Sequence, residues 1–178
     1  TSAYESSYSF DLNGNLTQLT RNGSGKAADG AAISAQMDNF TYNYENGSGG
    51  SVVLPTVLNR LFSVQDAVTT SPYTDDIKNG QSSAIANYTY DEIGRLVSDV
   101  DEEILSIEWT VTSKVRYITR TPGSTMSDVE FKYDPMGNRI AKIEYPAAPD
   151  SDITTTFYVR DAQGNLMATY QKVATTTQ

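Results

Sequence analysis

The sequence predicts an all-β protein built from successive antiparallel hairpins. Its 12 Tyr against 1 Trp, with frequent Thr, Ser, Asn and Gly, suit short strands joined by many turns. An Asp-x-x-Gly motif recurs four times, each time after an aromatic segment and before an aliphatic residue. Elsewhere Ile107, Trp109 and Val111 alternate with polar residues, which predicts a strand with one buried face.

The reference unit of this pattern is residues 87–100, NYTYDEIGRLVSDV. Tyr88 and Tyr90 are two residues apart, so a strand places both rings on one face. Asp91 suits the first position of a type I turn, and Gly94 suits its end, where a positive φ is needed. Leu96 then begins an aliphatic strand. The unit therefore predicts a β-hairpin with a tight turn.

Copies of the unit are expected near residues 8–20, 42–66, 88–100, 131–143 and 158–170. Their turn residues are predicted to be Asp11, Gly14, Asp91, Gly94, Asp134, Gly137, Asp161 and Gly164. Four motifs in register, with one degenerate copy, indicate a repeat architecture. A lone two-stranded hairpin is marginally stable in water, so the copies are expected to pair as one module spanning residues 1–178.

The copy at residues 42–66 is degenerate, because Glu45 replaces the Asp and a Gly- and Ser-rich stretch interrupts the turn. We expect a short extra strand over residues 52–58, around Pro55, and a resumed second strand from Asn59 to Asp66. The stretches 23–36, 67–86 and 146–152 predict loops, and Ser113-Lys114 predicts a turn.

Two further copies depart from the reference unit. In residues 131–143, Pro135 follows Asp134, as type I turns favour. The aliphatic Ile140 comes one residue late, as if Arg139 were inserted, which predicts a bulge or a re-aimed second strand. In residues 158–170, Arg160 takes the second aromatic position.

Composition excludes several classes of function. The net charge of −9 argues against nucleic acid as a partner. No apolar run is long enough for a membrane span or a signal-peptide core. The absence of Cys and His removes disulfides, thiol chemistry, an imidazole base and His metal ligands. We expect no enzymatic activity, no catalytic residue, no metal site and no cofactor.

At residues 88–96 the pattern Y-x-Y-D-x-x-G-x-L resembles the YD repeats of Rhs proteins, as do its copies at 8–16, 131–140 and 158–166 and the strand of Ile107 and Trp109 with its return strand. Similar repeats occur in teneurins and in the shell components of insecticidal Tc toxins. The resemblance covers roughly residues 8–170, interrupted at 23–36, 47–58 and 67–86. It implies an antiparallel sheet that spirals into a hollow shell, of which this chain would be a curved piece.

The resemblance also implies a function. The chain would be a non-catalytic segment of a large secreted or cell-surface bacterial protein, enclosing or displaying a downstream segment, a toxin in some members. Its partners would be the remainder of the parent polypeptide. Self-cleavage in the family belongs to a region that would follow residue 178. We do not assign self-cleavage to Asp134-Pro135, which lies in an ordinary repeat turn.

Each candidate site has a structural alternative. The turn carboxylates could form acid–base pairs, as in glycosidases, but their regular place predicts turn caps. The acidic residues 99–103 lack the spacing of a calcium loop and predict a solvated turn. Aromatic rows can stack on sugars, although they more often form cross-strand pairs. An extracellular carbohydrate-binding or adhesion module is thus the alternative function, with these glycan contacts: Tyr42, Tyr44, Tyr88, Tyr90, Trp109 and Tyr133.

Overall fold

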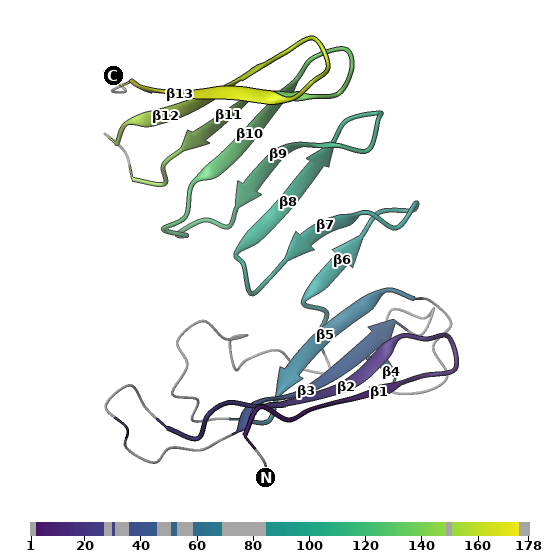
Figure 1. Cartoon of the computed structure of the whole chain (residues 1–178). Coiled ribbons are helices and arrows are strands. Elements are labelled where there is room, and N and C mark those ends of the chain that lie inside the picture. Colours follow the sequence, from purple (N-terminus) through teal and green to yellow (C-terminus); the bar gives the residue numbers. More distant parts are fainter. Residues whose placement is uncertain are drawn as a thin grey trace. The chain divides into compact units, whose positions relative to one another are not determined.

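The computed structural model describes residues 3–26, 30, 36–45, 51–52, 59–68, 85–148 and 151–174. These residues form strands and turns without any helix, which confirms the all-β prediction (Figure 1). The strands are β1 Ser6–Phe10, β2 Leu16–Asn22, β3 Gln36–Glu45, β4 Ser51–Val52, β5 Leu61–Asp66, β6 Tyr88–Tyr90, β7 Leu96–Asp99, β8 Ile104–Trp109, β9 Val115–Arg120, β10 Asp128–Tyr133, β11 Arg139–Tyr145, β12 Ile153–Arg160 and β13 Leu166–Ala174.

The strands belong to two antiparallel sheets. In the five-stranded sheet, β1 to β4 follow one another, and β5 also pairs with β3. In the eight-stranded sheet, the spatial order from β6 to β13 is the order of the sequence, as expected for successive hairpins. The chain also divides into two compact units, Thr1–Arg95 and Leu96–Gln178.

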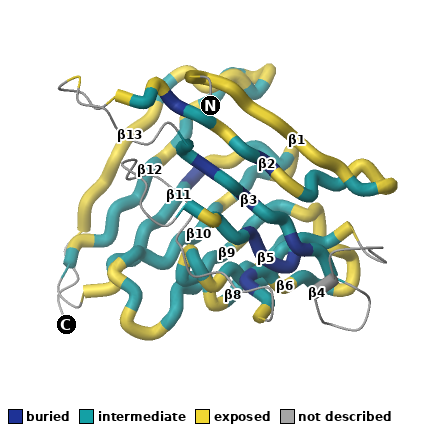
Figure 2. Tube along the Cα trace, turned by 90° about the horizontal axis from the view of Figure 1, so that it is seen from below, coloured by how far each residue is buried: buried dark blue, intermediate teal, exposed yellow. Residues whose placement is uncertain are grey.

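The first unit has a small buried core. Leu19 on β2, Phe40 on β3 and Val64 on β5 pack together, and Figure 2 shows the buried positions along these strands. Half-buried Leu16, Tyr42, Leu61 and Tyr88 surround this core. The strands therefore bury one apolar face, as alternating sequences do in antiparallel sheets.

Polar residues are also buried in these strands and are paired. The amide of Asn43, 2% exposed, donates to the hydroxyl of the fully buried Ser63 over 3.1 Å. The carboxylate of the buried Asp38 forms an ion pair with Arg21 across β2 and β3. Because buried polar groups are costly without partners, these pairs restrict which residues of the strands can face each other.

The second unit is a meander with little burial. Within its described part, Ala141 is the one apolar residue below 9% exposure, and most other strand residues are half-buried. Val111, which we expected on the buried face of a strand, is fully exposed because β8 ends at Trp109 and Val111 lies in the following turn. Packing therefore comes from cross-strand neighbours more than from an enclosed core.

The interrupted copy carries an insertion, as predicted. Tyr44 on β3 pairs with Leu61 on β5, and the amide of Glu45 donates to the carbonyl of Arg60 over 2.9 Å, which joins the hairpin on both sides of the insertion. A two-residue strand, β4 Ser51–Val52, pairs with Tyr44 and Glu45, and it shares only Val52 with the extra strand expected over residues 52–58. Residues 53–58, and most of the predicted loop 67–86, lie outside the described residues.

The expectation that Arg139 is inserted was wrong. Asp134, Gly137 and Asn138 have the spacing of the other copies, and Tyr133 pairs with Arg139 just as Phe10 pairs with Leu16. Arg139 therefore replaces the aliphatic residue of the unit, and its guanidinium lies 4.2 Å from the centre of the Phe131 ring. The predicted bulge is present, but an equivalent register shift occurs in the hairpins β1–β2, β8–β9 and β12–β13 as well.

Candidate functional site

The Asp-x-x-Gly turns share one hydrogen-bond pattern, which is clearest at Asp134. Its carbonyl accepts from the Gly137 amide over 2.9 Å, and its amide donates to the carbonyl of Asn138 over 3.0 Å. Its carboxylate accepts from the Asn138 backbone over 2.8 Å and from the Asn138 side chain over 3.0 Å. Gly137 has φ +83°, which a side chain would disfavour. The turn is thus a type I turn closed by a glycine and capped by its own carboxylate.

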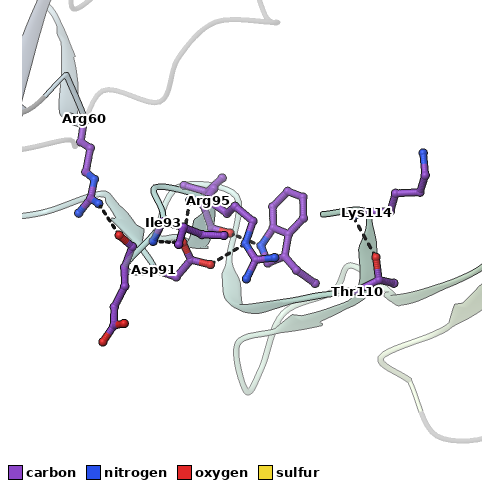
Figure 3. A network of polar contacts seen from close by, with 9 residues as sticks. Arg60, Asp91, Ile93, Arg95, Thr110 and Lys114 are labelled. Atoms are coloured by element: carbon purple, nitrogen blue, oxygen red, sulfur yellow. Dashed lines mark hydrogen bonds and ion pairs between the residues drawn. The ribbon is translucent and has the colours of Figure 1, made fainter. Parts of the chain in front are cut away.

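The other three turns repeat this geometry. Asp11, Asp91 and Asp161 each accept from the amide four residues later over 2.8 Å. Their glycines have φ between +84° and +88°. After Asp91, Arg95 takes the place of the Asn, and its Nε donates to the carboxylate over 2.6 Å (Figure 3). All four predicted turn carboxylates therefore act as caps in the structure.

Capping explains the electrostatics of these carboxylates. A backbone hydrogen bond from Arg95 is the main cause that lowers the pKa of Asp91. Side-chain hydrogen bonds from Asn138 and Asn165 are the main causes that lower the pKa of Asp134 and of Asp161. A carboxyl that ionises more readily than usual suits a charged cap and does not suit a general acid at neutral pH.

A further turn of the same kind, without Asp or Gly, lies at Thr110–Lys114. The carbonyl of Thr110 accepts from the Ser113 amide over 3.0 Å, and Ser113 takes the positive φ, at +57°. The hydroxyl of Thr110 accepts from the Lys114 amide over 3.0 Å, so it replaces the carboxylate (Figure 3). Trp109 pairs with Val115 across the turn. The sequence predicts the turn at Ser113-Lys114, but this hairpin was not counted among the copies because Thr and Ser replace the two residues that define the motif.

A second recurring bond links successive hairpins. The pre-turn residue is the one directly before the capping Asp or its substitute. The post-turn residue is the fifth residue after that capping residue. The pre-turn Tyr133 donates its hydroxyl to the carbonyl of Val115, the post-turn residue of the preceding hairpin, over 2.8 Å. The indole Nε1 of pre-turn Trp109 donates to post-turn Leu96 over 2.8 Å. We call this bond the tether.

The same tether occurs at other copies with other donors. Tyr44 donates to the carbonyl of Leu16 over 2.9 Å, in the first unit. Arg160 donates through Nε to the carbonyl of Arg139 over 3.2 Å, in the second. Tyr, Trp and Arg share a long side chain with an N–H or O–H donor, so the position selects a donor rather than an aromatic ring.

The glycan candidates are these same rings or their neighbours. Tyr42, Tyr44, Tyr88, Tyr90, Trp109 and Tyr133 are all half-buried. Three of them, Tyr44, Trp109 and Tyr133, use their polar atom in a tether. Burial also raises the pKa of Tyr90 to about 12. Their arrangement holds hairpins together and leaves only part of each ring for a ligand.

Other candidate sites are modest. Lys114, Arg139 and Arg160 line a shallow cavity of about 500 Å³ with Tyr158 and Leu166. The acidic stretch 99–103 forms a turn in which the amide of Glu103 donates to the carbonyl of Val100 over 3.1 Å. Within the described ranges, no three acidic, His or Cys side chains gather as metal ligands. The part of the chain that the structure describes also contains no helix long and apolar enough to cross a membrane.

Comparison with protein-family models and with curated proteins gives no match for this chain.

Proposed function

We propose that this chain is a structural segment of a larger Rhs/YD-repeat protein, where its hairpins form part of the wall of a β-shell. In this role it would enclose or display a downstream segment of a secreted or cell-surface bacterial polypeptide. The observation that carries the proposal is the tether, because it joins hairpin to hairpin at the same position in both compact units.

A wall needs hairpins that add to one another in a fixed register. The capped turn fixes the register within each hairpin, and the tether fixes the next hairpin against it. The low burial of the second unit also suits a wall, since a single sheet layer encloses little apolar volume. The repeated carboxylates serve as turn caps, so these four Asp residues do not form an acid–base pair.

A carbohydrate-binding or adhesion module is the second candidate. It is favoured by exposed rings outside the tethers, because Tyr8 on β1 and Tyr170 on β13 are 57% and 61% exposed. Exposed aromatic faces are suited to stacking on apolar sugar faces. Binding would then depend on these rings more than on the half-buried rows.

The solution mass of the 178-residue chain, measured by light scattering over a concentration series, tests the first proposal. A wall segment has strand edges that seek neighbours, so its mass should grow with concentration without a fixed stoichiometry. A monomer at every concentration would contradict a wall segment. Saturable binding to a glycan panel at millimolar ligand, lost in Tyr8→Ala or Tyr170→Ala, would establish the second candidate instead.

A further inference from the structure

We propose that the shallow cavity of the second unit is a binding site for a compact, doubly charged oxyanion, the phosphate or sulfate group of a small ligand. Lys114, Arg139 and Arg160 line this cavity, and its described lining includes no Asp or Glu. Its volume of about 500 Å³ lies within the usual range of small-molecule sites. The proposal concerns a ligand of this unit and is independent of the wall function.

The three cations of the cavity lack the acidic partners that other cations of the same unit have. Three such cations each form an ion pair with a glutamate on the same or the adjacent strand: Arg116, Lys132 and Lys142. Among the described residues, Lys114, Arg139 and Arg160 form no ion pair. Cations gathered around one cavity repel one another, and an anion bound between them would offset that repulsion.

Two of the cations are held by contacts that use none of their side-chain donors. The stem of Lys114 packs on Gly137, where an added Cβ would lie 2.8 Å from its Cε, and its ammonium lies 5.8 Å from the centre of the Tyr133 ring. The guanidinium of Arg139 lies over the Phe131 ring. A cation over a ring face keeps its N–H groups for other acceptors, and neither side chain forms a hydrogen bond to a described residue.

The third cation is fixed by backbone carbonyls. Arg160 donates through Nε to the carbonyl of Arg139 over 3.2 Å and through Nη1 to the carbonyl of Gly164 over 2.8 Å. Within the described chain its Nη2 donates to no acceptor. The lining therefore contains three cations that are already positioned and still carry free donors. Positioned donors lose less conformational entropy when a ligand binds.

The charge and chemistry of this lining favour a phosphate or sulfate group. Arginine donors match the oxygens of such groups in pairs, and lysine adds a point charge. Three cations suit a group of about two negative charges better than a single carboxylate. An extended polyanion would also meet the rest of a chain of net charge −9, since exposed charges act over about 10 Å at 0.1 M salt. Tyr158 and Leu166 on the same lining offer contact to an apolar group attached to the anion.

The test is a titration of the full chain with inorganic phosphate and with inorganic sulfate, followed by backbone amide chemical shifts. We expect saturable shifts at Gly137 and Asn138, which line the cavity, at millimolar ligand. Arg139→Gln should weaken binding about tenfold, the effect of losing one charged hydrogen bond, and Lys114→Gln should do the same. The urea midpoint of each variant, read from the fluorescence of Trp109, establishes that it is folded.

The matched control is Arg116→Gln, which removes the same charge from an exposed arginine that is paired with Glu108 and does not line the cavity. Its affinity should stay within about twofold of the parent, because solvent and salt screen an exposed charge. Equal weakening in Arg116→Gln and Arg139→Gln would overturn the inference, since binding would then follow net charge alone.

Phenyl phosphate distinguishes the source of the oxyanion. Tighter binding than that of inorganic phosphate would assign an ester ligand, whose ring contacts Tyr158 and Leu166, and binding no tighter would assign the free ion. Acetate or chloride bound as tightly as sulfate, heparin bound more tightly than sulfate, or the absence of saturable shifts would each overturn the inference. Light scattering tests the wall proposal separately.

Discussion

The tether predicts a specific loss of stability when its donor is removed from Tyr133. In Tyr133→Phe the ring stays, while the 2.8 Å bond to the carbonyl of Val115 is lost. A typical intramolecular hydrogen bond contributes about 0.5–1.5 kcal/mol net. Tyr133 is half-buried, so water can partly replace the donor, and we expect a loss of about 1 kcal/mol.

Urea unfolding followed by tryptophan fluorescence is a suitable assay. Trp109 is the single Trp of the chain and lies in the second unit, so its fluorescence reports unfolding there. With a slope of about 2 kcal/mol per molar urea, a loss of about 1 kcal/mol lowers the midpoint by about 0.5 M. The slope itself should not change, because the substitution leaves the exposed surface of the unfolded chain nearly the same.

Tyr158→Phe is the matched control, since Tyr158 lines the same cavity as Tyr133 and precedes the Asp of its turn by three residues rather than one. Among the described residues its hydroxyl forms no hydrogen bond. We therefore expect its midpoint to stay within about 0.2 M of the parent, as for a surface change without a lost contact. Equal shifts in the two variants, or no shift in Tyr133→Phe, would refute the tether as a stabilising contact.

Three further predictions follow from the turns and the core. Gly14→Ala should cost about 1 kcal/mol, because open space surrounds the site and only its φ of +84° opposes a side chain; thermal unfolding by circular dichroism measures it. In Asp134→Asn, the urea midpoint should fall less steeply between pH 7 and pH 2.5 than it does in the parent chain. The folded pKa of Asp134 is lowered by its bonds from Asn138, so its contribution is full above the unfolded pKa near 3.9 and is lost as pH falls through the folded value. Asn43→Ala should cost about 1–3 kcal/mol, because it removes the partner of the buried Ser63, and adding Ser63→Ala should recover part of that loss in the same measurement.

The hairpins themselves were predictable from the sequence, because their determinants are local. A carboxylate at the start of a turn and a glycine at its end act within five residues, and residues 11–15 and 134–138 show the expected bonds. The interrupted copy was also predictable, since Arg60-Leu61 continues the unit after the insertion. Local chemistry specifies these elements before any tertiary contact forms.

The tether was not predictable from residue types, because it links positions on different hairpins. If pre-turn residues are sorted by whether they are aromatic, Trp109 and Tyr133 fall together and Arg160 is an exception. The structure puts all three into one class of donors. Arg139 was misassigned for a related reason. The register was judged from the first aliphatic residue after the turn. That rule fails here because Arg139, whose guanidinium stacks on Phe131, occupies the position of the aliphatic residue.

The caps and the tethers together explain how a sheet with so little burial can specify one register. In the second unit apolar burial does little to resist a strand slip, since Ala141 is its one buried apolar residue among those described. A slip by one residue would move the hydroxyl of Tyr133 to the opposite face and away from the carbonyl of Val115. It would also separate the carboxylate of Asp134 from the amides that cap it. Polar bonds at the turn end of each hairpin thus supply the register that a buried core supplies in thicker domains, and residues along the rest of each strand can vary without changing it.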